Sequence, residues 1–207
     1  MLKVLKMPVE PLGSNCYLAW DSANNQAVII DPGGEGERIV ATVEKHGLEV
    51  QLILNTHGHG DHIAANGMLK KRFGVPILIH EADAPMLTDP LRNMSAIYGF
   101  PVTSPPCDGF LVPGEKIAFG RLAFHVLHTP GHSPGGVSLY SGGCVFTGDV
   151  LFFGSVGRYD LPEGDETLLI RGIREHLLTL PEETQVYPGH GQNTTIGMEK
   201  RCNPFLV

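Results

Sequence analysis

The sequence predicts a mixed α/β fold in which two β-sheets pack face to face and helices cover their outer faces. Three observations predict this fold class. Short strand-like runs outnumber helical segments, most of these runs are apolar enough to need cover on both faces, and 26 glycines and 16 prolines among 207 residues provide frequent turns. The length predicts a single domain over residues 1–207. No glycine-rich nucleotide-binding motif follows a strand, which argues against a doubly wound sheet.

The first half of the chain alternates predicted strands with two helices. Three strands come first, at residues 2–9, 15–20 and 27–31. A helix is predicted over 35–46, because Ile39, Val40 and Val43 share one helical face and Gly47 follows as a stop signal. The remaining elements of this half are a strand, a short helix and a strand, at 51–55, 68–73 and 76–80.

The second half is richer in strands. Residues 81–100 are weakly helical, and a proline-rich connection follows at 101–113. Four strands are then predicted, at 116–119, 122–129, 136–140 and 144–147. The clearest helix spans 167–178, where four apolar residues recur at helical spacing. A last strand at 185–187 precedes a short tail.

Composition and charge restrict the function classes. The net charge of −7 and the isoelectric point near 5.8 speak against a nucleic-acid-binding protein, whose footprint is a basic face. No stretch approaches the roughly 18 apolar residues of a membrane span, so no membrane partner is expected. The four cysteines form no C-x-x-C pair, and two lie in apolar runs as small buried hydrophobes. We expect a cytoplasmic protein with reduced thiols, as a monomer or a small homo-oligomer.

A dense polar motif, T-H-G-H-G-D-H, directly follows a predicted strand. It places three imidazoles and one carboxylate at His57, His59, Asp61 and His62. The glycine spacers allow the backbone to fold so that these side chains converge. Neutral imidazole and carboxylate are ligands that suit zinc, iron or manganese. The motif therefore predicts a metal site rather than a solvated polar loop.

Three further glycine-rich loops each follow a predicted strand and carry one potential ligand, at His132, Asp149 and His190. Ligands at the C-terminal ends of separate strands can build one rigid, open site. The donors divide into two sets of three with one carboxylate between them: His57, His59 and His132; Asp61, His62 and His190; and Asp149. This number suits two metal ions about 3.5–4 Å apart with a water between them.

The motifs T-H-G-H-G-D-H, P-G-H-S-P-G, T-G-D and P-G-H-G, in this order, resemble the metallo-β-lactamase superfamily. N-C-Y at 15–17 and I-D-P-G at 30–33 are similar to the opening strands of that family. The resemblance implies a four-layer αββα sandwich with two divalent metal ions at one edge, bridged by Asp149. Zinc is the expected metal, and iron and manganese are the alternatives. The implied ligands are His57, His59, Asp61, His62, His132, Asp149 and His190.

Within the superfamily, the segments 153–162 and 188–199 resemble the thioester hydrolases related to glyoxalase II, the hydroxyacylglutathione hydrolases. This resemblance implies cleavage of a small thioester, an S-acyl glutathione, by a hydroxide held between the two metals. It implies catalytic roles for Asp61 and Asp149, with Asp61 also orienting the nucleophile. Arg158 matches the basic position that helps to hold glutathione.

Departures from the related families leave alternatives open. The β-lactamases of the superfamily carry a cysteine in place of Asp149, so antibiotic hydrolysis is not expected. Glyoxalase II has an additional helical domain after its last ligand, whereas a short stretch follows His190, and Gln192 replaces a tyrosine. One alternative is a mononuclear iron persulfide dioxygenase, which shares most of these ligands. The other is a non-catalytic binding protein of the same fold.

The remaining polar residues near these motifs have supporting roles. Asp31 and Thr56 flank the ligands and are expected to hydrogen-bond to metal-bound histidines. Five histidines have no partner motif and are expected to be structural: His46, His80, His125, His128 and His176.

Overall fold

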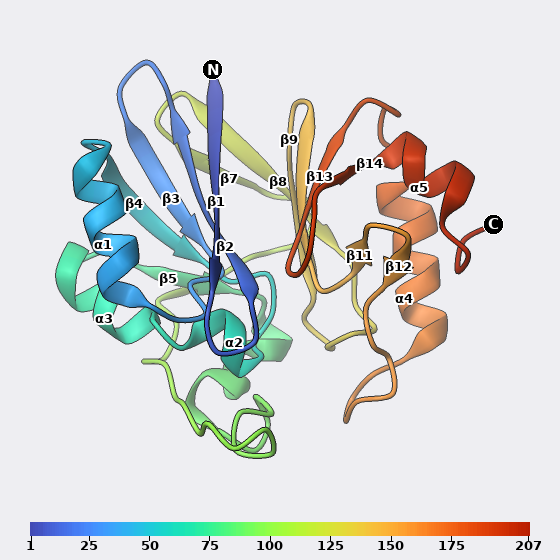
Figure 1. The fold of residues 1–207 in the computed structure, drawn as a ribbon, viewed down its shortest axis with the longest axis horizontal. Helices are drawn as coiled ribbons and strands as arrows, with labels where there is room; N and C mark the ends of the chain where they lie inside the picture. The colour runs from blue at the N-terminus through green and yellow to red at the C-terminus, as the bar shows by residue number, and fades with distance from the viewer.

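The computed structural model describes residues 1–207 and confirms two β-sheets packed face to face (Figure 1). The strands of the first six-stranded sheet, in spatial order, are β1 (Leu2–Val9), β2 (Ser14–Asp21), β3 (Gln26–Ile30), β4 (Glu49–Leu54), β5 (Ile77–Ile79) and β6 (Gly109–Phe110). Those of the second are β14 (Thr194–Thr195), β13 (Gln185–Pro188), β10 (Cys144–Gly148), β9 (Val137–Ser141), β8 (Leu122–His128) and β7 (Lys116–Phe119). Both sheets mix parallel and antiparallel pairs.

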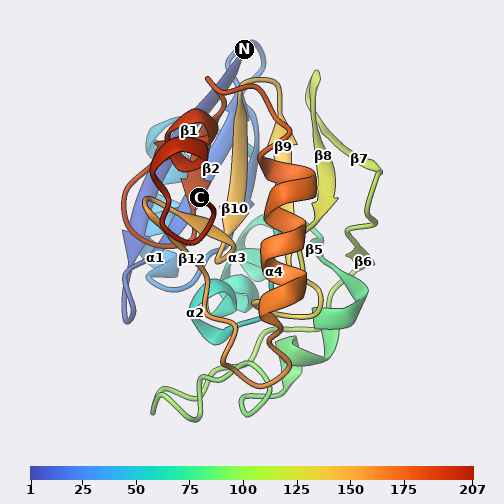
Figure 2. The same cartoon turned by 90° about the vertical axis from the view of Figure 1, so that its right-hand side faces the viewer.

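Helices cover the outer face of each sheet, so the molecule has four layers (Figure 1). The helices on the first sheet are α1 (Gly36–Lys45) and α3 (Asn66–Phe73). Those on the second are α4 (Glu166–Gly172), its π-helical continuation η2 (Ile173–Leu177) and α5 (Ile196–Cys202). Figure 2 shows α4 and α5 in front of the second sheet. None of the helices combines the length and the hydropathy that crossing a bilayer requires.

The alternation of side chains along β2 shows why the layers form. Tyr17 and Ala19 belong to the core between the two sheets. Their neighbours Cys16 and Leu18 belong to the core under α1 and α3. Because successive side chains of a strand point to opposite faces, one apolar strand contributes to two cores. The sheet is therefore apolar on both faces and needs helices outside it.

The helices form where apolar residues recur at helical spacing. In α1, Ile39 and Val43 are buried against the first sheet. Leu169, Ile173 and Leu177 form the buried face of α4 and η2, which confirms the predicted helix. Full burial of each such side chain contributes roughly 1.5–3 kcal/mol to stability, before the entropy of ordering is subtracted.

Three parts of the chain differ from the sequence prediction. The weakly helical segment 81–100 contains only the 3₁₀ helix η1 (Glu81–Thr88), followed by turns, because Pro85 and Pro90 disfavour a regular α-helix. The predicted tail after the last strand is wrong, since it contains β14 and α5. Three short elements were also not predicted: the single turn α2 (Gly60–Ile63), the strand β6 within the segment 101–113, and the hairpin of β11 (Leu151–Phe152) and β12 (Ser155–Val156).

Strand direction brings four loops to the same edge of the sandwich. In the second sheet, β8, β10 and β13 run parallel to one another, so the loops that follow them lie at one end. The loop after β4 of the first sheet meets them there, at the lower edge in Figure 1. These are the four loops that carry the predicted ligands.

Candidate metal centre

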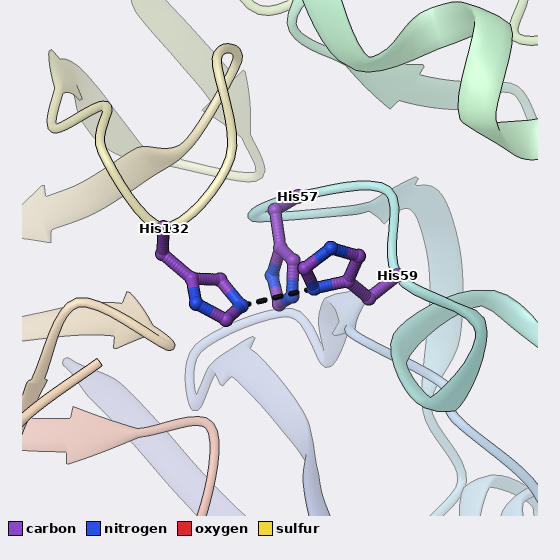
Figure 3. A group of neighbouring side chains, drawn as sticks. All are labelled: His57, His59 and His132. Carbon is purple, nitrogen blue, oxygen red and sulfur yellow. Dashed lines mark hydrogen bonds between the residues drawn. The ribbon is translucent and has the colours of Figure 1, made fainter. Parts of the chain in front are cut away.

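The structure gathers the first predicted set of ligands, His57, His59 and His132, into one cluster. Nδ1 of His59 lies 2.9 Å from Nε2 of His132, and one ring nitrogen from each residue fits within 4.8 Å of the others. Figure 3 shows the three imidazoles converging from two loops. We call this cluster the first triad. All three residues are buried.

The second predicted set, Asp61, His62 and His190, forms a neighbouring cluster. Its ligand atoms also lie within 4.8 Å of one another, and Nε2 of His190 is 3.1 Å from Oδ2 of Asp61. We call this cluster the second triad. Asp61 and His62 are buried, whereas the His190 side chain is 31% exposed, so this triad faces solvent more than the first.

The carboxylate of Asp149 lies between the two triads. Its Oδ2 is 3.6 Å from Nε2 of His132 in the first triad and 3.5 Å from Nε2 of His190 in the second. Its Oδ1 is 3.5 Å from Nε2 of His62. One carboxylate therefore faces donors of both triads.

A change of backbone conformation within the motif separates its ligands into the two triads. The chain is still extended at His59, where φ is −68° and ψ is 150°. Side chains two positions apart in extended chain share one side, and this brings His57 and His59 together. The turn α2 then begins at Gly60 and redirects Asp61 and His62 toward the second triad.

Thr56 hydrogen-bonds to a histidine of the first triad, as predicted from its position, and Asp31 lies at ion-pair distance from a histidine of the second. The Thr56 hydroxyl donates to Oδ2 of Asp31 at 2.6 Å, so its oxygen accepts from Nδ1 of His57 at 3.2 Å. The same Asp31 oxygen is 3.2 Å from Nδ1 of His62. Both histidines are thereby left with Nε2 facing the centre. Asp31 itself has a φ of +50°, a left-handed conformation that is uncommon outside glycine.

His132 is oriented in the same way by a backbone carbonyl. The carbonyl oxygen of Arg158 is 2.8 Å from Nδ1 of His132, and because a carbonyl only accepts, Nδ1 carries the proton. The Nε2 lone pair of His132 is therefore directed toward the other two residues of the first triad, His57 and His59.

Unpartnered buried atoms show that these residues fit metal ions. Nε2 of His57, both ring nitrogens of His62 and Oδ1 of Asp149 are buried and make no hydrogen bond within the protein, although Nδ1 of His62 lies at ion-pair distance from Asp31. Buried polar atoms almost always have a hydrogen-bond partner. Several unpartnered nitrogen and oxygen atoms that face the same point therefore indicate that a ligand binds there. Imidazole nitrogens and carboxylate oxygens are the donors that zinc and iron take. The two triads and Asp149 together suit a dimetal site.

The electrostatics of the two triads differ. Burial, reinforced by the neighbouring histidines, holds the pKa of His57 well below its usual value and lowers the pKa of His59 to about 3. Burial also acts against protonation of His62, but the carboxylates of Asp61, Asp149 and Asp31 outweigh it and raise the pKa of His62 to about 10. His57 and His59 are therefore neutral donors at pH 7, while the second triad carries the stronger negative potential for a cation.

The second-triad loops are fixed by polar residues of β2 to which the sequence assigned no role at the site. Ser14 donates its hydroxyl to the carbonyl oxygen of Asp61 at 2.5 Å. The side-chain amide of Asn15 donates to the carbonyl oxygens of Pro188 at 2.9 Å and Gly191 at 3.0 Å. Asn15 stands out in the sequence only as part of the N-C-Y resemblance at 15–17, and the signal for Ser14 is that a polar residue begins an otherwise apolar strand.

A pocket of about 300 Å³ opens beside the centre. Its walls combine ligands of both triads with apolar side chains, including Leu12, Phe152 and Leu161. Arg158 also lines the pocket. However, its guanidinium donates two hydrogen bonds to the carboxylate of Asp160, at 2.9 and 3.0 Å. The cation predicted to hold a substrate carboxylate is thus already paired.

The five other histidines lie outside the centre. His80 and His128 stack on each other with ring centroids 4.6 Å apart. His46 packs beside Trp20, and His125 lies beside Tyr140. None of the five belongs to a group of potential metal ligands.

Known proteins share this fold and this set of motifs. A family model described as the metallo-beta-lactamase superfamily matches residues 9–190. A Haemophilus influenzae protein named hydroxyacylglutathione hydrolase GloC is 42% identical over 204 residues, which cover 97% of this chain and 96% of that protein. The predicted resemblance is confirmed.

Two solved structures are similar over nearly the full length of both chains. A structure described as BLEG-1 B3 metallo-beta-lactamase has a TM-score of 0.95 and 40% identity, and covers 99% of this chain and 100% of that one. A di-iron-bound form of TTHA1623 has a TM-score of 0.87 and 41% identity, with 98% and 100% covered. The four-layer fold class is confirmed. The chain belongs to the metallo-beta-lactamase superfamily and is a metallo-hydrolase.

Proposed function

We propose that this protein hydrolyses a small thioester, an S-acyl glutathione, with two zinc ions held by the two triads and Asp149. The observation that carries the proposal is the Asp149 carboxylate, which faces His132 of the first triad and His62 and His190 of the second. The name of the GloC relative, a hydroxyacylglutathione hydrolase at 42% identity, supports the substrate class.

The chain's own residues define what the site does. Two divalent ions bound here would lower the pKa of a bound water toward 7 and polarise a carbonyl oxygen. His57, His59 and His132 would hold one ion through neutral rings, and Asp61, with His62 and His190, would hold the other and could orient a bound water. Because a thiolate is a good leaving group, with a thiol pKa near 8.5, no strong general acid is needed.

The pocket supports a thioester substrate of modest size. Its apolar wall of Leu12, Phe152, Val156 and Leu161 suits an acyl group and a thiol. Tyr98 and Arg158 lie at the same pocket, with the Tyr98 hydroxyl 3.3 Å from Nη1 of Arg158. We assign Arg158 to a carboxylate of the glutathione portion.

The direct test measures S-lactoylglutathione hydrolysis by purified protein together with its metal content. Wild-type protein should bind two zinc ions and hydrolyse the thioester. His132→Ala should lose most activity and metal, whereas the matched control His125→Ala, a histidine outside the centre, should keep both. Oxygen consumption with glutathione persulfide and a single bound iron would instead support the dioxygenase alternative.

A second candidate function is β-lactam hydrolysis. It is favoured by the 40% identity and TM-score of 0.95 to the structure described as a B3 metallo-beta-lactamase. The hydroxyacylglutathione hydrolase relative, 42% identical over 97% of this chain, supports the thioester instead. A chromogenic cephalosporin assayed beside S-lactoylglutathione separates the two: we expect the larger kcat/KM for the thioester.

A further inference from the structure

Asp83 is a buried carboxylate outside the two triads that accepts hydrogen bonds from two different loops. It lies in the first turn of η1 and is 0% exposed. Its Oδ2 accepts from the Gly58 backbone N–H at 3.0 Å and from the Ser133 hydroxyl at 2.7 Å. Its Oδ1 accepts from the Gly135 backbone N–H at 2.6 Å. No cation lies within ion-pair distance of it.

The donors to Asp83 belong to the loops that carry the first triad. Gly58 separates His57 from His59 in the loop after β4 of the first sheet. Ser133 directly follows His132 in the loop after β8 of the second sheet. One carboxylate therefore joins the two loops, from opposite sheets, that supply all three ligands of the first triad.

The two loops approach η1 so closely that only glycine fits at the points of contact. A Cβ on Gly135 would lie 2.7 Å from both the backbone nitrogen and Oδ1 of Asp83. A Cβ on Gly58 would lie 2.6 Å from the Cβ of Met86, one turn further along η1. Both loops thus pack against η1 at glycines, and no side chain separates them from Asp83.

Burying this carboxylate is costly unless its oxygens are satisfied. Burial raises the pKa of Asp83, and the hydrogen bonds from Ser133, Gly135 and Gly58 oppose that rise. An aliphatic side chain would fill the same space without the cost of burying a carboxylate. However, it would accept no hydrogen bonds and so would not join the two loops. The choice of a carboxylate is explained by the three donors that it holds together.

We propose that Asp83 is a positioning residue that assembles the first triad by fixing the separation of its two loops. It touches neither the substrate nor a metal ion; it acts through Gly58 on His57 and His59, and through Ser133 and Gly135 on His132. The inference rests on the two-metal function proposed above and adds a residue to it.

Asp83→Asn is the informative substitution, because all three partners of the carboxylate are donors. The amide keeps the size of the side chain but has a single acceptor oxygen. If the NH₂ group takes the place of Oδ2, it faces the Gly58 N–H and the bond to the first loop is lost. If it takes the place of Oδ1, it faces the Gly135 N–H and one oxygen is left to hold both Gly58 and Ser133, so the contact between the loops is weakened in either orientation. The control is Asp21→Asn, since Asp21 is also 0% exposed and accepts from the backbone N–H groups of Ala23 and Arg121, at the far end of β2. Asp21 differs from Asp83 in that it also pairs with the Arg121 guanidinium and with the amino terminus.

The experiment measures zinc affinity by chelator competition in two backgrounds that each keep one triad. His190→Ala leaves the first triad complete, and His57→Ala leaves the second. We expect Asp83→Asn to weaken zinc binding about 10- to 100-fold in the His190→Ala background and less than about twofold in the His57→Ala background. Asp21→Asn should leave both affinities within about twofold, whatever it does to the unfolding temperature. If Asp83 only stabilised the fold, Asp83→Asn would lower the zinc affinity of both triads to a similar extent.

The outcomes separate this inference from the function beneath it. An unchanged affinity in the His190→Ala background, or an equal loss in both backgrounds, would overturn the role of Asp83 and leave the two-metal function standing. A wild-type chain that takes up fewer than two zinc ions would overturn that function and this inference with it. If Asp83→Asn does not fold, Ser133→Ala removes one of the three donors. It should then weaken the first triad alone by several-fold, and no loss would count against the role of Asp83.

Discussion

The phenolic hydroxyl of Tyr17 donates a hydrogen bond of 2.7 Å to the carbonyl oxygen of Pro188. Tyr17 belongs to β2 of the first sheet, and Pro188 ends β13 of the second, two residues before His190. The bond therefore joins the two sheets where the last ligand loop begins. Asn15 donates to the same carbonyl oxygen, at 2.9 Å. The second triad thus depends on contacts between the sheets, as the first does.

Tyr17→Phe tests this contact without emptying the core. The ring stays, one buried hydrogen bond is lost, and the Pro188 carbonyl keeps its bond from Asn15. We expect a loss of about 0.5–1.5 kcal/mol in the free energy of unfolding, or roughly 1–6 °C in the Tm of the metal-free protein. Asn15→Ala removes two bonds and should cost more. Equal Tm values for wild type and both variants would contradict the assignment.

Asp149→Ala should affect both metal sites at once. The carboxylate faces ligands of both triads, so its removal takes one oxygen ligand away from each metal site. We expect Asp149→Ala to release more metal on dialysis than either His132→Ala or His190→Ala, each of which removes a ligand from one triad. Elemental analysis of the metal bound per chain checks this. Two metals retained in Asp149→Ala would show that the carboxylate does not bridge the sites.

The two triads should differ in proton release when they bind metal. The pKa of His62 is raised to about 10, so without metal this residue is protonated at pH 7, whereas His57 and His59 are neutral. A metal ion takes only the neutral imidazole, so binding must displace the His62 proton. Zinc affinity at the second triad should therefore rise with pH, by up to about tenfold per unit between pH 6 and 8.

Calorimetry in buffers of different ionisation enthalpy measures these protons. With His57→Ala, which keeps the second triad, we expect about one proton released per zinc ion at pH 7 from His62. With His190→Ala, which keeps the first triad, release should be smaller. Equal release in the two variants would be inconsistent with the opposite pKa shifts of His62 and His59.

Because Arg158 pairs with Asp160, changes at these two residues should affect the KM of an anionic substrate differently from that of a neutral one. If Arg158 holds a substrate carboxylate, Arg158→Ala should raise KM for S-lactoylglutathione roughly 10- to 150-fold, the effect of losing a charge-assisted hydrogen bond of about 1.5–3 kcal/mol. The KM of a neutral thioester and the metal content should not change. Asp160→Asn frees the guanidinium and should lower KM for the anionic substrate. Parallel changes on both substrates would mean that Arg158 supports the pocket's structure instead.

Much of the fold was predictable because local patterns and burial agree. Ile39 and Val43 in α1, and Ile173 and Leu177 in η2, recur at helical spacing and are buried as that spacing predicts. In α4 the predicted Leu168 and Ile170 are only half-buried, and Leu169 is the buried residue instead. The helix α5 was not predicted, because its stability comes from tertiary contacts. Its Glu199 is buried and accepts hydrogen bonds from Thr194, Gly154 and Asn203. An isolated glutamate in a short polar segment gives no such signal.

The candidate site also has a part that the sequence predicts and a part that it does not. His57, His59 and the other proposed ligands stand out because reactive side chains follow strands in glycine-rich loops. Asp31 and Thr56, which position two of the ligands, could be predicted because they flank the ligand motifs, whereas positioning residues from distant segments do not stand out. Asp83 lies in a segment that looks like an ordinary helix start, and its partners are 25 to 52 positions away. The Asp160 partner of Arg158 was likewise not predicted, since pairing of two exposed charges depends on the loop conformation.

The dependence of thioester hydrolysis on bound metal tests the two-metal account most directly. Metal-free protein is titrated with zinc, and the rate of S-lactoylglutathione hydrolysis is followed against equivalents of zinc per chain. We expect little activity up to one equivalent and a rise to a plateau at two, because Asp149 places the two triads around one reaction centre. Full activity at a single equivalent, or no hydrolysis with two ions bound, would contradict the account.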